Sequence, residues 1–201
     1  MYLLFFVFVF GVVGAVPLHF VSVGHTKLQA RYGTDNGVKI GEAYGRLSGY
    51  LLFFSMIGIW VSPQPRFTVR VLPKVLLLFP FINLSIPLTH LIIFLFGFLP
   101  GFFLLYHSVS DLSRKVSEAH QPEKVVSTGI YARVRHPQYL SFILLHIGFS
   151  FLFSGLYALL ATPLVFLMLY AFARKEEAEL VKEFGNDYEE YKKEVPMFIP
   201  R

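Results

Sequence analysis

Long uncharged apolar runs alternate with short charged clusters along this chain. Residues 1–23, 47–61, 75–110 and 139–173 contain no Lys, Arg, Asp or Glu. Because an α-helix rises about 1.5 Å per residue, about 20 apolar residues cross a hydrocarbon core of about 30 Å. The pattern therefore predicts helices that cross a membrane, with the charged clusters as the loops between them.

The first three spans are predicted from the N-terminal part of this pattern. The first run is interpreted as a span and not as a cleaved signal peptide, because the first positive charge, Lys27, follows the apolar stretch. Residues 47–61 predict the second span. The run 75–110 is too long for one crossing and is broken by three prolines. We therefore expect a span over 88–110 and an interfacial or re-entrant segment near 75–87.

The run 139–173 is long enough for two crossings and has Ser154-Gly155 near its middle. It predicts a helical hairpin that forms spans four and five, with a kink at Pro163 in the second arm.

Apolar and aromatic residues recur at helical spacing in the C-terminal tail, which predicts an amphipathic helix against the membrane or the protein. We expect Gly185 to interrupt this helix, Asn186 to cap a second helix, and Glu189 to take the capping-box position. The stripe is interpreted as packing and not as a cofactor site. Its residues are Leu180, Phe184, Tyr188, Tyr191 and Val195.

The distribution of positive charge orients this arrangement. With five spans, 15 of the 18 Lys and Arg fall on one side, and with 75–87 as a sixth span 14 do, so the positive-inside rule favours five by a small margin. Either way the loop 111–138 and the tail 174–201 share the cytoplasmic face. With five spans the N-terminus is expected on the other side. The predicted fold is an all-α polytopic membrane protein with N-terminal spans in 1–110 and a catalytic region in 111–201.

Composition supports the membrane interpretation and removes several function classes. The chain is 55% hydrophobic and has 23 Phe among 201 residues, more than a soluble domain of this length could bury. It has no Cys, and its histidines form no pair at ligand spacing, so we expect no metal site. There is no Gly-rich dinucleotide motif. The net charge of +5 is attributed to Lys and Arg beside anionic lipid headgroups, and no nucleic-acid partner is expected.

The first candidate for chemistry is the polar segment before span four. There Gly129-Ile130-Tyr131 leads into Arg135, His136 and Pro137. Proline favours the first turn of a helix, so we expect His136 as the N-cap and Pro137 as the first helical residue. The unpaired amides of such a helix end, beside Arg135, attract a carboxylate or a phosphate. The alternative is that Arg135 and His136 only anchor the helix to headgroups.

The second candidate is the pair Glu176 and Glu177, directly after span five. Acidic groups this close to hydrocarbon need a partner. That partner could be a cationic ligand; the pair could equally be a solvated helix start or could form ion pairs with Arg133 or Arg135.

Together with Tyr131 and Tyr139, these groups are compatible with S-adenosylmethionine. Its carboxylate fits a helix N-terminus, and its ammonium and sulfonium fit a glutamate and aromatic faces.

Two blocks within residues 120–201, in this order and separated by the predicted hairpin, resemble the isoprenylcysteine carboxyl methyltransferase family, whose superfamily includes phospholipid N-methyltransferases. The first block comprises the segment from Glu123 to Tyr131 and the run Arg135-His136-Pro137-Gln138-Tyr139. The second comprises Glu176-Glu177, the segment from Glu183 to Tyr188, Tyr191, and Val195-Pro196 to Pro200.

The resemblance implies an S-adenosylmethionine-dependent methyltransferase that acts on a lipid or a prenylated small molecule in the membrane. It implies a cofactor site made of Glu123, Lys124, Val125, Val126, Tyr131, His136, Pro137, Gln138, Tyr139 and Glu176. Arg135, Glu177 and Arg174 are the candidate catalytic residues.

One position departs from the family. The carboxyl methyltransferases place a substrate-contacting Arg four residues before the first Glu of the pair, where this chain has Phe172. Arg174 is near in sequence but faces elsewhere on an ideal helix. An isoprenylcysteine substrate is therefore less well supported than methyl transfer itself.

Three other functions compete with this one. The first is N-methylation of a phospholipid. The second is an NADPH-dependent reduction like that of sterol reductases, which share a similar RHPxY block but carry more spans and a differently spaced set of polar residues in the tail. The third is a membrane protein that has kept the fold without catalysis.

Overall fold

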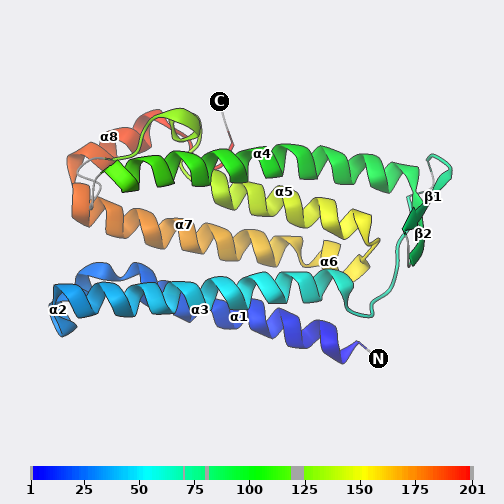
Figure 1. Ribbon diagram of the computed structural model, residues 1–201, viewed down its shortest axis with the longest axis horizontal. Coiled ribbons are helices and arrows are strands. Elements are labelled where there is room, and N and C mark those ends of the chain that lie inside the picture. Colours follow the sequence, from blue (N-terminus) through cyan, green and yellow to red (C-terminus); the bar gives the residue numbers. More distant parts are fainter. Residues whose placement is uncertain (1, 70, 80–81, 119–124, 200–201) are drawn as a thin grey trace.

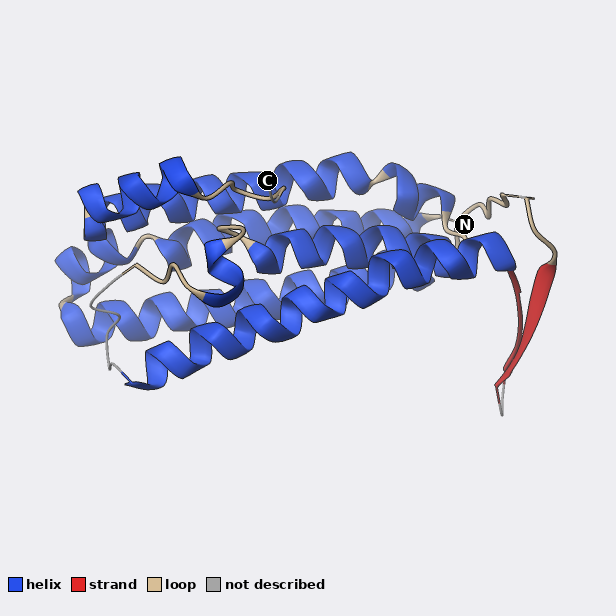
Figure 2. Cartoon of the chain, turned by 90° about the horizontal axis from the view of Figure 1, so that it is seen from above, coloured by secondary structure: helices blue, strands red, loops and turns tan. Residues whose placement is uncertain are grey.

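The chain folds into an elongated bundle of α-helices, described by a computed structural model for residues 2–69, 71–79, 82–118 and 125–199. The long helices run along the long axis of the bundle, and two perpendicular views agree on this arrangement (Figures 1 and 2). They are α1 (Leu3–Val23), α3 (Thr34–Val61), α4 (Leu88–Glu118), α5 (Pro137–Leu152) and α7 (Thr162–Phe184). The short helices are α2 (His25–Tyr32), α6 (Leu156–Leu160), α8 (Asn186–Glu194) and the 3-10 turn η1 (Gly129–Ala132).

Two of the long helices are apolar and long enough to cross a membrane, namely α1 and residues 88–112 of α4. Their outer faces expose large apolar side chains, including Phe10 on α1 and Phe96 on α4, as expected for surfaces that meet lipid. The apolar helix α5 is shorter. The helices expected over the first, third, fourth and fifth spans are all present. The number of membrane crossings stays a prediction.

The segment before α4 forms an antiparallel β-hairpin, which the sequence analysis did not predict. Strand β1 (Lys74–Phe79) pairs with β2 (Ile82–Pro87), so that Lys74 faces Pro87 and Phe79 faces Ile82. The bundle is all-α, as predicted, and the hairpin is the exception among the described residues. β2 ends at Pro87, and α4 begins at the next residue. Proline lacks the N–H that a helix interior needs, so the helix begins after it. An interfacial position for this segment stays a prediction.

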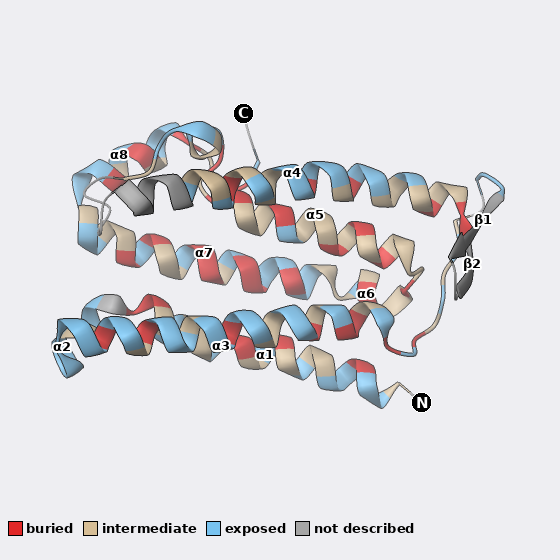
Figure 3. Cartoon of the chain, viewed as in Figure 1, coloured by how far each residue is buried: buried red, intermediate tan, exposed pale blue. Residues whose placement is uncertain are grey.

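Helix α7 has neighbours on several sides. Four of its buried side chains recur at helical spacing, namely Val165, Met168, Leu169 and Phe172. Figure 3 shows buried and exposed positions alternating along the α7 ribbon. They belong to one apolar cluster with Phe5 and other residues of α1 and α3. This packing fixes the polar C-terminal part of α7 relative to α1 and α5.

The prediction that Pro163 kinks the second arm of the helical hairpin is wrong. Helix α6 ends at Leu160 and α7 begins at Thr162, so Pro163 lies in the first turn of a new helix, where no intrahelical N–H bond is required of it. The arm is therefore broken and not bent.

The predicted interruption of the tail at Gly185 is confirmed, but the capping prediction is wrong. Gly185 has a φ of 56° and occupies the N-cap of α8, while Asn186 is the first helical residue and no side chain caps this helix. The left-handed φ explains the choice, because glycine adopts it without the steric cost that other residues incur.

The contact between α4 and α5 depends on glycine. A Cβ on Gly97 would lie 2.7 Å from the carbonyl oxygen of Leu144 and 3.2 Å from the Cα of Gly148. The two backbones can approach this closely only without side chains at these positions.

We expect Gly97→Ala to destabilise the bundle by about 1–3 kcal/mol, because the added methyl group meets rigid backbone and the helices must separate. Thermal unfolding in detergent measures the effect. Gly49→Ala in α3 is the matched control, since no atom lies within 4 Å of a Cβ there and alanine is the better helix former. Equal melting temperatures for the two variants would contradict the interpretation.

Candidate functional site

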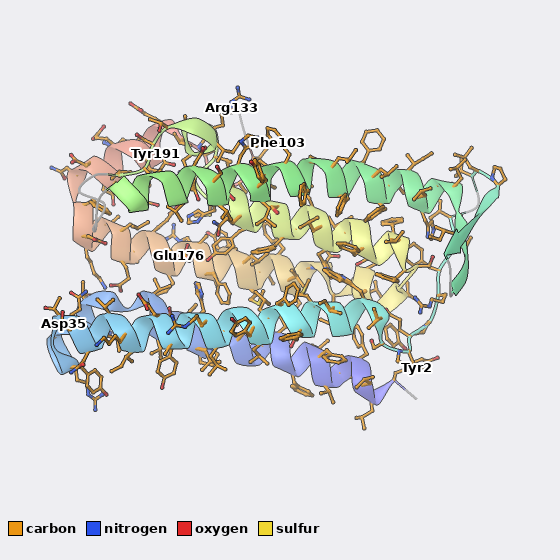
Figure 4. The ribbon with its side chains drawn as sticks, in the orientation of Figure 1. Tyr2, Asp35, Phe103, Arg133, Glu176 and Tyr191 are labelled. Carbon is orange, nitrogen blue, oxygen red and sulfur yellow. The ribbon has the colours of Figure 1, made fainter. Side chains whose placement is uncertain are left out.

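A cavity of about 390 Å³ lies at the polar end of the bundle. Figure 4 shows Glu176 and Tyr191 toward the same end as Asp35, with Tyr2 at the opposite end. The cavity is bordered by the start of α5, the polar part of α7, the segment before η1, and α8. Its lining residues are Val23, Leu112, Val125, Val126, Tyr131, Arg135, His136, Pro137, Gln138, Tyr139, Glu176, Glu179, Leu180, Glu183, Phe184, Tyr188 and Tyr191.

A buried ion pair joins α5 to α7 at this end. The Arg135 Nε donates to the Glu177 Oε1 at 2.7 Å, and the side chains are only 9% and 4% exposed. Arg135 also donates to the backbone carbonyls of Lys192, at 3.0 Å, and Val195. The His136 Nε2 lies 3.2 Å from the same Glu177 oxygen. The guanidinium therefore makes these contacts within the protein, to α7 and to the tail.

The ionised state of Glu177 follows from these contacts. Burial raises its pKa, but the hydrogen bonds from His136 and Arg135 and their charges lower it by more, so that the net pKa lies below the usual range. The Glu177 Oε2 is buried and has no hydrogen-bond partner within the described residues.

The backbone next to this pair is bound to the tail. The amide of Arg135 donates to the Pro196 carbonyl at 2.9 Å, and the amide of His136 donates to the Met197 carbonyl at 3.1 Å. These two bonds hold the tail against the start of α5.

The neighbouring glutamate has a different environment. The Glu176 side chain is 28% exposed and lines the cavity. One oxygen accepts the Tyr139 hydroxyl and lies 3.2 Å from the His19 Nε2, and the other lies 3.6 Å from the His136 Nδ1. Consecutive residues on a helix point about 100° apart, which lets Glu177 face the arginine while Glu176 faces the cavity.

The start of α5 has the predicted geometry. His136 is the N-cap and Pro137 the first helical residue, and the first amide that bonds within the helix is that of Leu140, to the His136 carbonyl at 3.1 Å. Gln138 and Tyr139 line the cavity, and their amides have no acceptor within the described part of the chain. Such a helix start favours a negative group.

The wall opposite α7 is fixed by a close approach of Gly129 to Asp111. Gly129 has a φ of 65°, a Cβ there would collide with the Asp111 carboxylate, and the Asp111 Oδ2 accepts the amide of Ile130 at 3.0 Å. Tyr191 on α8 donates its hydroxyl to the Tyr131 carbonyl at 2.6 Å. Burial, together with the charges of Glu176 and Asp111, raises the pKa of Tyr131 to about 12, so this phenol is neutral at physiological pH.

A second acid borders the cavity with its charge already compensated. Glu179 accepts hydrogen bonds from Lys175 at 2.8 Å, from Lys182 at 2.7 Å and from the Thr26 hydroxyl of α2 at 3.0 Å. Burial raises its pKa, but these bonds lower it by more, to about 2. Its partners leave Glu176 as the less neutralised of the two acids.

The residues predicted to bind a cofactor are brought together wherever the structure describes them. All of them except Glu123 and Lys124, which lie outside the described residues, line the cavity. Of the three candidate catalytic residues, Arg135 lines the cavity. Glu177 forms the ion pair with Arg135 and is not a lining residue. Arg174 is exposed on α7 and is not a lining residue either. The roles of all these residues stay predictions.

Sequence reasoning missed part of the lining. Tyr188, Tyr191 and Val195 pack together, as the packing interpretation of the stripe requires, but Tyr188 and Tyr191 also line the cavity, as do Leu180 and Phe184. Their helical periodicity could not distinguish the two roles. Val23, Leu112 and Glu179 were not singled out, and Glu183 was named only as part of the second block of the family resemblance. Within the described residues no group of three or more His, Cys, Asp or Glu could hold a metal ion.

Comparison with known proteins bears on this end of the bundle. Residues 90–182 match the isoprenylcysteine carboxyl methyltransferase (ICMT) family. Protein-S-isoprenylcysteine O-methyltransferase of Schizosaccharomyces pombe is 39% identical over 88 residues, which are 42% of this chain and 36% of that protein. Methanethiol S-methyltransferase 2 of Bradyrhizobium diazoefficiens is 36% identical over 74 residues, 36% of this chain and 27% of that protein.

The aligned stretches thus span about a third of the length of these relatives. No solved structure matches the chain. The matched range contains α5 and most of α4 and α7, and α5 and α7 supply much of the cavity wall. Residues 90–182, slightly less than half of this chain, are therefore similar to the isoprenylcysteine carboxyl methyltransferase family.

Proposed function

We propose that this protein transfers a methyl group from S-adenosylmethionine to a lipophilic acceptor held in a membrane. The observation that carries the proposal is the single cavity wall formed by the motif residues from two distant segments, before α5 and at the end of α7. Both relatives are named as methyltransferases, one of a prenylcysteine and one of methanethiol.

The cavity suits the cofactor in volume and charge. Its 390 Å³ lies within the range of small-molecule sites, about 300–1,000 Å³. The amides at the start of α5 would hold the carboxylate of the cofactor and Glu176 its ammonium. The aromatic faces of Tyr131 and Tyr188 suit the sulfonium. The Nε and Nη1 of Arg135 already donate to Glu177 and to two tail carbonyls, so we assign the carboxylate to the amides at the start of α5.

When bound, S-adenosylmethionine supplies an electrophilic methyl group on a sulfonium. Transfer is an in-line displacement, so the protein has to orient the reactants and exclude water and needs no nucleophile of its own. The ion pair of Arg135 with Glu177 holds α5, α7 and the tail in register around the cavity. Glu176 supplies a fixed negative charge at its wall.

We propose a lipid or a prenylated small molecule as the acceptor. It would enter laterally from the bilayer between helices, with its reactive group at the polar end, which would be the cytoplasmic face of a protein with about five spans. Phe172 stands where the family resemblance places a substrate-contacting Arg, and it is 2% exposed. This side chain offers no positive charge for a carboxylate, so N-methylation of a phospholipid is the principal alternative acceptor chemistry.

Purified protein incubated with methyl-labelled S-adenosylmethionine and membrane lipid extract should place label in a lipid fraction, because the proposed acceptor partitions into the bilayer. Thin-layer separation of the extract identifies the fraction, and base hydrolysis releases the label from a methyl ester but not from an amine. If well-folded protein labels no lipid, the lipid-acceptor proposal is wrong. Heat-unfolded protein provides the background.

Replacing the cavity-facing carboxylate should weaken cofactor binding. We expect Glu176→Gln to lower the affinity for S-adenosylhomocysteine about tenfold or more, because a hydrogen bond to a charged group is lost, worth about 1.5–3 kcal/mol. Calorimetric titration of solubilised protein measures it.

Glu190→Gln is the matched control, since Glu190 is exposed on α8 and pairs only with Lys193, at 2.7 Å. It should bind like the unaltered protein. A parallel titration with NADPH tests the reductase alternative. Tight NADPH binding, or folded protein that binds neither NADPH nor S-adenosylhomocysteine, would exclude the proposed function.

A further inference from the structure

A histidine from the first helix contacts the cavity-facing glutamate. The His19 Nε2 lies 3.2 Å from the Glu176 Oε1, the same oxygen that accepts the Tyr139 hydroxyl, and 3.4 Å from that hydroxyl. The His19 side chain is 17% exposed. It lies outside residues 90–182, the range that matches the family, and outside both motif blocks.

The ring of His19 is held in a defined orientation. It stacks on Phe172 with 3.9 Å between ring centroids and 20° between planes. Phe20 meets the same Phe172 ring edge-on at 6.2 Å. Stacking on one face and a polar contact at Nε2 together restrict the imidazole to one position, from which it can fix the carboxylate it touches.

A second contact joins the N-terminal helices to the same end of α7. The Thr26 hydroxyl of α2 donates to the Glu179 Oε2 at 3.0 Å. Glu176 and Glu179 lie about one turn apart on α7, so both cavity-lining acids of this turn receive a polar contact from the N-terminal segment. Val23 of this segment lines the cavity, while His19 and Thr26 contact two lining acids without being lining residues themselves.

We propose that His19 is a positioning residue for Glu176: the imidazole donates its Nε2 proton to the carboxylate and holds it toward the cavity. The proposal rests on the proposed function, because it assigns Glu176 the cofactor ammonium as its ligand. A neutral imidazole that donates at Nε2 orients the carboxylate and leaves its negative charge available.

Two substitutions separate the ring contact from the hydrogen bond. His19→Phe keeps an aromatic ring against Phe172 and loses the donor. His19→Gln loses the ring and keeps a side-chain N–H at a similar reach. Calorimetric titration with S-adenosylhomocysteine, with thermal unfolding to verify the fold, compares both variants with unaltered protein.

We expect His19→Phe to bind about tenfold more weakly and His19→Gln to remain within about threefold of the unaltered protein. This rescue by the variant that keeps the donor is the result that a purely structural role of the ring would not give. Phe20→Leu is the neighbouring control, since Phe20 touches Phe172 but has no polar group to contact Glu176, and it should keep the affinity.

The outcomes are distinguishable. If the unaltered protein does not bind S-adenosylhomocysteine, the proposed function fails and this inference fails with it. If the unaltered protein binds but both His19 variants have its affinity, only the inference fails. Equal weakening by His19→Phe and His19→Gln also overturns it, because the retained N–H of Gln would then have no effect. If His19→Phe does not fold, the affinity of His19→Gln decides, and a loss of more than about threefold overturns the inference.

Discussion

The buried contact between Arg135 and Glu177 is the constraint on which the polar end of this protein depends. A guanidinium with 9% exposure needs acceptors for its donors, because an unpaired buried charge is costly. Here the acceptors come from α7 and from the carbonyls of Lys192 and Val195 in the tail. One side chain thus connects the start of α5, the polar part of α7 and the tail, three segments that the cavity needs in register.

The two adjacent glutamates show how this constraint distributes roles. Glu177 is enclosed and compensated, and its lowered pKa reflects partners that belong to the protein. Glu176 is partly exposed, lines the cavity and is contacted by Tyr139, His19 and His136. The structural carboxylate is thus separate from the cavity-facing one, so a ligand that met Glu176 would leave the buried ion pair intact.

Much of the fold and of the site follows from local sequence signals. The uncharged runs predict α1, α4, α5 and α7 because the thickness of the hydrocarbon core sets the length of an apolar helix. Pro137 after His136 marks a helix start because the φ of proline is fixed. Local signals do not decide where they have two solutions. Pro163 could bend a helix or begin one, and tertiary packing chooses between them. In the apolar segment before α4, the sequence pattern did not reveal the pairing of β1 with β2.

The contact of His19 with Glu176 could not be predicted from local sequence signals, for a different reason. A single histidine in an apolar run has no partner in its own neighbourhood, and the motif blocks lie far along the chain. Only the packing of α1 against α7, through Phe172 among others, brings it to the site. Phe172, the position that departs from the resemblance to the carboxyl methyltransferases, is therefore also the residue on which His19 of the first helix stacks.

The pairing of the tail with the start of α5 has a consequence for assembly. The amides of Arg135 and His136 bond to the carbonyls of Pro196 and Met197, which are synthesised after every helix of the bundle. Until then Arg135 lacks its tail acceptors, and α8 has not closed its side of the cavity. The bundle can thus be inserted and packed first, while the polar end is completed last, so that the cavity is closed only in a chain whose helices are already in place.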